Sequence, residues 1–252
     1  MRRLAKAKVV SSNLISRSKI KNPDIDQDFF IVKLTIKQQV LQCRMRRIIT
    51  INREFGSGGR EFGKRLADSL GCAYYDRYIL EELSKKLSMD EDYLERTLET
   101  NWNQYHWAYG RTLLTGRFAT QNSLLLAEQH KLVKQLAMQG DCVVVGANAD
   151  LILRELNPLR VFVYADIESK IARCHERETD DEKFSDREWA QKIKAIDKSR
   201  ADKHDMVSSV YPWGDKRGYD LCINTSAMAI KNIIPAMKHF VTNWFKEQHH
   251  GD

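Results

Sequence analysis

The sequence predicts an α/β fold in which a parallel sheet of about five strands is flanked by helices. Short apolar runs alternate with longer amphipathic segments, the order in which parallel strands and crossover helices occur along a chain. The runs at 142–146 and 159–164 are almost continuously apolar, as expected of strands that are buried on both faces. A glycine-rich segment also follows the first strand directly and precedes a helix.

The individual elements follow from the length and periodicity of these runs. Strands are expected at 47–52, 72–75, 142–146, 159–164 and 219–223. Helices are expected at 60–70, 77–87, 90–100, 121–139, 148–156, 167–178, 185–205 and 228–246. Ser185 and Glu188 have the spacing of a capping box, which indicates a helix start at that point. Ligands of parallel sheets bind beyond the carboxyl ends of the strands, so we expect the glycine-rich segment at the binding edge.

The strand at 48–51 and the segment Gly56-Ser57-Gly58-Gly59 together predict a phosphate cradle. Glycines let backbone N–H groups approach an anion closely, and the start of the next helix adds partial positive charge. A glycine turn without a ligand is the alternative. The segment departs from the pattern G-x-x-x-x-G-K-[ST] at Glu54, Arg60 and Glu61. The residues expected to bind phosphate are Gly56, Ser57, Gly58, Gly59, Arg60 and Glu61.

The net charge of +7 is concentrated near the N-terminus. Residues 1–44 contain ten Lys and Arg against three Asp, whereas 45–252 contain 31 residues of each sign. The folded body is therefore neutral, and its charge does not indicate a nucleic-acid partner. We interpret 1–44 as a dispensable extension or a misplaced start before Met45. A transit peptide or a solvated tail is the alternative. Residues 45–252 are expected to form the domain.

Neither a membrane anchor nor a metal site is indicated. The extension has no apolar run long enough for a signal peptide or a membrane span. The five cysteines include no C-x-x-C and the seven histidines no H-x-x-x-H pair, so we assign no metal-binding residues. The cysteines are expected to be small buried hydrophobes in a reducing compartment, which favours a cytoplasmic location. The oligomeric state stays open.

Two stretches fit the alternation less well. Residues 101–119 are aromatic and punctuated by glycine, which is consistent with a flap beside a substrate or with a packed insertion. Residues 173–204 are densely charged with both signs. A solvated helical face is the usual reason for such a run, but a lid that closes over phosphates has the same composition.

Four motifs together resemble the cytidylate kinase-like proteins, which are P-loop relatives of bacterial cytidylate kinase. The segment from Arg53 to Glu61 is similar to that family's own loop, R-E-x-G-S-G-G-R-x. The other motifs, in the family's order, are Tyr75-Asp76, Val145-Gly146 with Ala149-Asp150, and Tyr219-Asp220-Leu221 with Ile223-Asn224-Thr225-Ser226. The likeness extends from about residue 46 to 245. Within it, 165–173 and Asp197-Lys198-Ser199-Arg200 resemble segments of the family's lid.

The resemblance implies a three-layer P-loop NTPase-like fold with a helical lid at about 173–204. It also implies phosphoryl transfer from ATP to a nucleoside monophosphate, CMP or dCMP, with Mg²⁺ held by residues that the sequence does not identify. The residues expected to act in catalysis are Arg60, Arg173, Arg177, Arg200 and Asp197. Those expected to contact the acceptor are Asp76, Arg77 and Asp197, with a water-mediated contact to Mg²⁺ as the alternative for Asp76 and Asp197. Nucleotides, and neither nucleic acid nor membrane, are the implied partners.

Two positions depart from the family pattern. Ala147 stands where the family usually has an arginine near the phosphates, and Lys203-His204 stand where it tends to place tyrosines. Both changes concern the presumed site and leave the fold unaffected. A nucleotide-binding module without turnover, or a kinase of another small phosphate acceptor, is therefore the alternative function.

Overall fold

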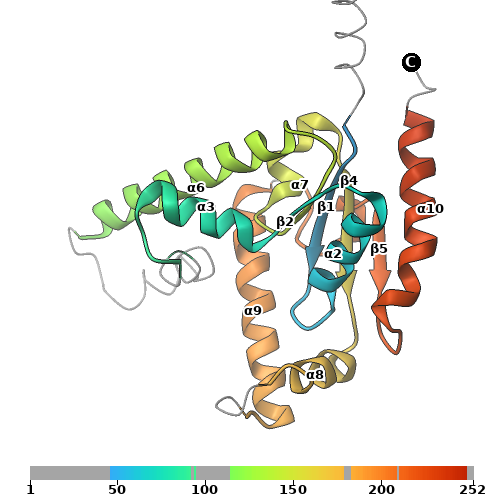
Figure 1. Ribbon diagram of the computed structural model, residues 1–252. Coiled ribbons are helices and arrows are strands. Elements are labelled where there is room, and N and C mark those ends of the chain that lie inside the picture. The colour runs from blue at the N-terminus through green and yellow to red at the C-terminus, as the bar shows by residue number, and fades with distance from the viewer. Residues whose placement is uncertain (1–45, 92–93, 95–113, 179–182, 209, 249–252) are drawn as a thin grey trace, which may run out of the picture. The chain divides into compact units, whose positions relative to one another are not determined.

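The computed structural model describes residues 46–91, 94, 114–178, 183–208 and 210–248, which belong to one compact unit, Arg46–Asp252. A five-stranded sheet in the order β2-β3-β1-β4-β5 lies at its centre (Figure 1). Its strands are β1 (Ile48–Arg53), β2 (Ala73–Tyr75), β3 (Cys142–Val145), β4 (Leu159–Tyr164) and β5 (Leu221–Asn224). All four neighbouring pairs are parallel. The segments that follow the five strands therefore meet along one edge of the sheet.

The central strand β1 pairs with apolar strands on both sides. Ile48 pairs with Cys142 of β3, and Ile49 pairs with Leu159 of β4. Successive side chains of a strand point to opposite faces, so an unbroken apolar run buries both faces at once. This is why the predicted strands at the centre of the sheet lack the alternation of a half-exposed strand.

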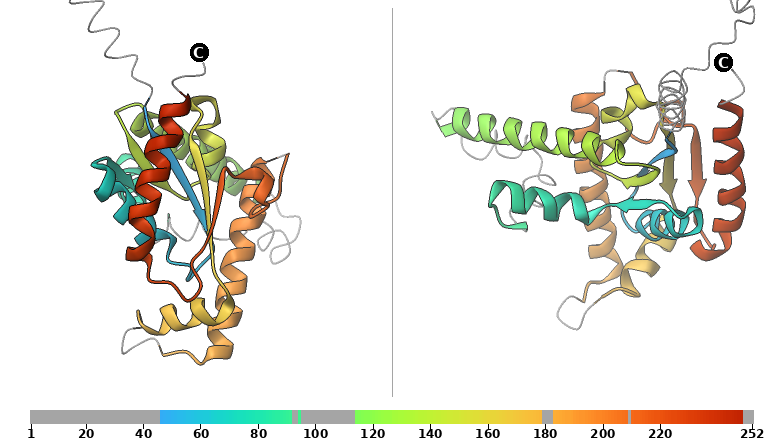
Figure 2. Two further views of the ribbon diagram at one scale, coloured as in Figure 1. Left: turned by 90° about the vertical axis from the view of Figure 1, so that its right-hand side faces the viewer. Right: turned by 45° about the horizontal axis from the view of Figure 1, so that its top comes forward.

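Helices cover both faces of the sheet, which makes three layers (Figures 1 and 2). Ile49 and Ile51 of β1 share a buried cluster with α2 (Gly59–Leu70) and α10 (Ile230–Gln248). On the opposite face, Ile48 belongs to a cluster with three other helices. These are α3 (Arg77–Leu87), α6 (Leu114–Ala137) and the short α7 (Ala149–Ile152).

The charged stretch that was expected to form a lid contains the end of α8 (Ile167–His175) and most of α9 (Asp186–Val207). Both helices begin at side-chain caps. The Asp166 carboxylate accepts the Ser169 amide at the start of α8, and Ser185 and Glu188 form the predicted capping box of α9. Figure 1 shows α8 lying against the lower part of α9. Cys174 of α8 forms a small buried cluster with Trp189 and Ile193 of α9.

The predicted fold class is confirmed, and the strands are found within two residues of their expected ends. The helix expected at 121–139 begins earlier, at Leu114. The helix expected at 148–156 is wrong in length. It stops at Ile152, and a 3₁₀ turn at Arg154–Leu156 ends in left-handed Asn157 just before β4.

Some expectations concern residues that the structure does not describe. These are the extension at 1–44, most of the helix expected at 90–100, and residues 101–113 of the aromatic stretch. Among the described residues, no helix has both the length and the apolar character needed to cross a bilayer.

Gly63 lies in α2 against the sheet, where a side chain has no room. A Cβ at this position would lie 2.7 Å from Val145 Cγ2 and 3.1 Å from Ile51 Cδ1. Gly63→Val is therefore expected to lower the free energy of unfolding by about 2–3 kcal/mol through overpacking. Gly140→Val is the matched control, because a Cβ there meets nothing within 4 Å. Equal losses for the two variants in urea denaturation would contradict the tight contact between α2 and the sheet.

Candidate phosphate-binding site

The loop between β1 and α2 presents its backbone at the carboxyl edge of the sheet. The Glu54 carbonyl accepts hydrogen bonds from the Ser57 amide at 3.3 Å and from the Ser57 hydroxyl at 2.8 Å, which closes a turn. Gly58 precedes α2 with a φ of 79°, a conformation that favours glycine, and no side chain caps the helix. The first N–H groups of a helix have no partner within it. The start of α2 can therefore offer donors and partial positive charge to an anion.

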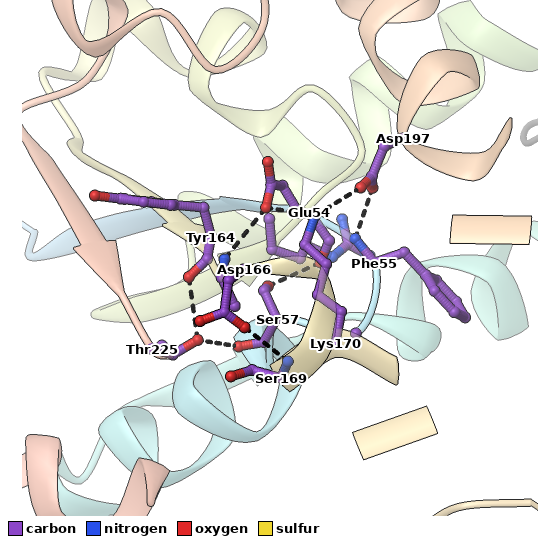
Figure 3. Close-up of polar contacts among 12 residues, drawn as sticks. Glu54, Phe55, Ser57, Tyr164, Asp166, Ser169, Lys170, Asp197 and Thr225 are labelled. Carbon is purple, nitrogen blue, oxygen red and sulfur yellow. Dashed lines mark hydrogen bonds and ion pairs between the residues drawn. The ribbon is translucent and has the colours of Figure 1, made fainter. Parts of the chain in front are cut away.

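The ends of β4 and β5 hold this loop through its backbone (Figure 3). The Thr225 hydroxyl, directly after β5, lies 2.7 Å from the Ser57 carbonyl oxygen and 3.1 Å from that of Tyr164. Ser57 is fully buried, and its hydroxyl is occupied by the turn at Glu54. The part of the loop that faces a ligand is therefore backbone and not the serine side chain.

Lys170 of α8 joins three segments of the site (Figure 3). Its ammonium lies 2.6 Å from Glu54 Oε2 and 3.2 Å from Asp197 Oδ2, and its side chain is only 9% exposed. The other Asp197 oxygen accepts the Phe55 amide at 2.6 Å. Glu54 Oε2 also accepts the Ala165 amide, directly after β4, at 3.2 Å. A buried ammonium is costly unless it is paired, so the two carboxylates fix α8 and α9 against the loop.

Asp197 and Arg200 bring α9 onto the backbone at the end of β1. Burial raises the pKa of Asp197, and the Phe55 amide, Lys170 and Arg200 oppose that rise without cancelling it. Arg200 Nη1 donates to the Arg53 carbonyl at 3.1 Å and lies 3.8 Å from Asp197 Oδ1. Its guanidinium also lies 5.7 Å from the centroid of the Phe55 ring. Two residues separated by three positions share one face of a helix, and here that face meets the loop.

Arg173, one turn after Lys170 on α8, donates to backbone carbonyls. Its Nη1 lies 3.4 Å from the Gly56 carbonyl oxygen, and its Nη2 donates to the carbonyls of Thr225 and Met228. These acceptors belong to the glycine loop and to the segment between β5 and α10. Arg173 therefore places a positive charge beside the loop while it joins the loop to a second segment.

Asp76, between β2 and α3, is paired with two arginines of the same edge. Its carboxylate lies 2.8 Å from Arg60 Nε and 3.7 Å from Arg53 Nη2. The Tyr74 hydroxyl donates to it at 3.3 Å, and burial is the main cause of the raised pKa of that hydroxyl. Arg53 also fills the space beside Gly146, where any Cβ would collide with its guanidinium. An expected phosphate ligand, Arg60, and an expected acceptor ligand, Asp76, are thus in direct contact.

The carboxylate of Glu61, in the first turn of α2, is paired with two arginines. It lies 2.8 Å from Arg65 Nε and 3.6 Å from Arg177 Nη2. Among the residues that the structure describes, no group of three or more His, Cys, Asp or Glu side chains could hold a metal ion. Mg²⁺ is commonly held by phosphate oxygens and water with only one or two carboxylates.

Most of the residues predicted from the sequence gather at this edge. Those that lie at the glycine loop or pair with one another are Arg60, Glu61, Asp76, Arg173, Arg177, Asp197 and Arg200. Arg77 is exposed at the first position of α3.

Three residues of the site, Glu54, Lys170 and Thr225, were not predicted as site residues. All three lie within motifs of the family resemblance, but a motif does not name the partner of a side chain. One signal was present, because Lys170 and Arg173 are spaced to share a face of the predicted helix. The partners of Lys170 lie on two segments far from it in the sequence, and no local pattern connects them.

A parallel sheet with a glycine loop between its central strand and a flanking helix defines the class of P-loop NTPase-like α/β proteins. The model of the cytidylate kinase-like family matches residues 48–227. The chain therefore belongs to the cytidylate kinase-like family. No curated protein matches it.

Several solved structures are similar to this chain. An uncharacterized protein from Eubacterium ventriosum ATCC 27560 is 23% identical with a TM-score of 0.57, over 78% of this chain and 99% of that one. A gluconokinase from Sinorhizobium meliloti 1021 is 14% identical with a TM-score of 0.44, over 82% and 98%. A shikimate kinase from Bacteroides thetaiotaomicron is 12% identical with a TM-score of 0.43, over 78% and 98%. The likeness to the first of these structures concerns the fold alone.

Lys170→Met tests whether the ion cluster with Glu54 and Asp197 anchors the site. The variant keeps the apolar stem but leaves two part-buried carboxylates without their shared cation. We expect the free energy of unfolding to fall by about 2–4 kcal/mol in chemical denaturation. Lys85→Met is the matched control, because that lysine is 69% exposed and pairs only with Glu82 among the ion pairs of the described residues; its loss is expected below about 1 kcal/mol.

Adding Glu54→Gln to Lys170→Met removes one of the stranded charges and should restore part of the stability. A Lys170→Met protein as stable as the Lys85→Met control would show that the cluster does not anchor the loop.

Proposed function

We propose that this protein transfers the γ-phosphoryl group of ATP to a nucleoside monophosphate, with CMP or dCMP as the expected acceptor. One observation carries the proposal: cationic side chains converge on a glycine loop at the start of a helix. Arg173 donates to the Gly56 carbonyl of that loop, Arg200 donates to the carbonyl of Arg53 at the end of β1, directly before the loop, and Arg60 lies in the first turn of the helix. Phosphoryl transfer is catalysed mainly by positioning and by stabilisation of negative charge, which is what such an arrangement can supply.

The donor phosphates would be bound by N–H groups at the start of α2 and by Arg60. An arginine has five N–H donors in a planar fork, so Arg60 can bind a phosphate while its Nε stays on Asp76. Arg60 then takes the role that a lysine has in the usual P-loop. Mg²⁺ bound with ATP would further neutralise its phosphates.

The acceptor would be bound by Asp76 and Asp197, and the charge that develops during transfer would be stabilised by Arg200 and Arg177. Lys170 contributes by orienting Asp197, since its ammonium lies 3.2 Å from Asp197 Oδ2. We propose the helices of 173–204 as a lid that closes over the phosphates and excludes water.

A nucleotide-binding module without turnover is the second candidate, and Ala147 favours it. The residue lies in the turn after β3, at the same edge as the glycine loop, where family members usually have an arginine. Gly146, Ala147 and Asn148 have φ of 74°, 56° and 52°. The turn therefore has a left-handed backbone, although the arginine usual at position 147 is missing. A kinase of another small phosphate acceptor is the third candidate.

Arg60→Ala tests phosphate binding at the start of α2. The variant is expected to weaken ATP binding by about 1.5–3 kcal/mol in calorimetry, the scale of a hydrogen bond to a charged group. Arg65→Ala is the matched control, since Arg65 lies on the same helix, is exposed and pairs with Glu61; its effect is expected to be small. Equal ATP affinity for the Arg60→Ala variant and the natural protein would refute this role.

The proposed reaction is tested by phosphoryl transfer from radiolabelled ATP across a panel of nucleoside monophosphates. Arg200→Ala should lower kcat about 10²-fold or more while it changes ATP binding much less, because a transition-state cation acts on developing charge. Lys198→Ala, an exposed change on the same helix, should stay within about twofold.

The same panel separates the alternatives. Transfer that appears only in an Ala147→Arg variant would identify a degenerate kinase. Absence of transfer in both forms, with ATP still bound, would favour the binding module. Transfer in the same assay to a small phosphate acceptor supplied in place of the nucleoside monophosphates would favour the third candidate.

A further inference from the structure

A buried histidine–carboxylate pair lies on the face of the sheet opposite α2. His204 of α9 and Asp150 of α7 have side chains that are each 5% exposed, and His204 Nε2 lies 3.1 Å from Asp150 Oδ2. His204 Nδ1 lies 3.2 Å from Asp205 Oδ1, which also accepts the Trp213 amide at 2.7 Å. The pair is separate from the contacts at the glycine loop, and the proposed reaction assigns it no role.

Other polar groups lie around the His204–Asp150 pair. The charge of Asp150 interacts with the Tyr219 hydroxyl and with Arg160 of β4. The Asn52 side-chain amide donates to Tyr219 at 3.2 Å. Among described atoms, Asp150 Oδ1 is buried without a hydrogen-bond partner, so His204 supplies the one hydrogen bond assigned to this carboxylate.

The two carboxylates favour the charged imidazole. A neutral imidazole has one N–H donor and can satisfy only one of Asp150 and Asp205, whereas the imidazolium donates to both. Burial lowers the pKa of His204, but the hydrogen bonds and charges of Asp150 and Asp205 outweigh it, so that the pKa is raised overall. The stability from the charged pair is therefore complete below the ordinary histidine pKa. It is lost as pH rises through the higher pKa of the folded state.

His204 lies on the part of α9 that meets the core of the domain. It follows Arg200 by four residues and Asp197 by seven, a spacing that places all three along one face of the helix. Its partner Asp150 lies in the helix that directly follows the turn at 146–148. The pair thus connects the turn after β3 to the helix that carries Asp197 and Arg200.

We propose that His204 is a positioning residue, which holds α9 through Asp150 so that Asp197 and Arg200 stay on the glycine loop. The proposal extends the function argued above, because those two residues are the ones assigned there to the acceptor and to transferred charge. A neutral His204 can donate to only one of its two carboxylates. Because Asp205 lies on α9 itself, the position of α9 becomes sensitive to pH when the carboxylate released is Asp150.

The test is amide hydrogen exchange of the full chain without nucleotide, so that failure of the proposed kinase activity does not affect it. The reporter is the Phe55 amide, which donates to Asp197, and the reference is the Val144 amide in the central sheet. His204→Leu should speed exchange at Phe55 about tenfold or more relative to Val144, the scale of a buried hydrogen bond that is lost. His239→Gln, an exposed change on α10, is the matched control and should leave that ratio unchanged.

His204→Gln separates positioning from charge, because glutamine can donate to Asp150 but cannot be protonated. We expect it to restore part of the Phe55 protection. We also expect it to remove the pH dependence that the natural protein should show above the ordinary histidine pKa, after correction for intrinsic exchange. Equal exchange ratios for His204→Leu and the natural protein would overturn the proposal, as would a pH dependence that persists unchanged in His204→Gln.

Discussion

The ammonium of Lys170 connects the three segments from which the site is built. It lies between a carboxylate of the loop after β1 and a carboxylate of α9, while its own helix follows β4. Burying an ammonium has a large desolvation penalty, which only close pairing with hydrogen-bonding acceptors offsets. The chain can therefore keep Lys170 inside only when both helices and the loop take the positions observed. The conformation of the glycine loop therefore depends on the positions of α8 and α9.

The site replaces several P-loop side chains with charged residues that hold one another. Glu54 occupies the place of the first glycine, and its carboxylate accepts the Ala165 amide as well as the Lys170 ammonium. Glu61 occupies the place of the magnesium-binding hydroxyl and is paired with arginines. The proposed phosphate binding would thus fall to the backbone and to arginine, whose planar fork suits phosphate oxygens. In this loop, the carboxylates organise the structure and the N–H groups and cations are available to the ligand.

Helix α9 carries two kinds of contact along one face. Toward its middle, Asp197 and Arg200 meet the backbone at the end of β1. Toward its C-terminus, His204 meets Asp150 on α7. A rigid helix transmits a change at one of these contacts to the other, because its residues move together. The position of the proposed lid therefore depends on contacts both at the loop and in the interior of the domain.

The sequence by itself determined the elements and the edge at which the site lies. Apolar periodicity located the five strands, the capping pattern located the start of α9, and the glycine segment after β1 marked the edge of the candidate site, because all of these are local signals. The length of α7 and the early start of α6 were not determined, since packing and turn geometry override local propensity at element ends. Only the tertiary structure decided that Lys170 pairs with Glu54 and Asp197, that Arg60 pairs with Asp76, and that His204 pairs with Asp150. These pairings join segments far apart in the chain. They become favourable only when the assembled core excludes water, so that the charged groups have only each other as partners.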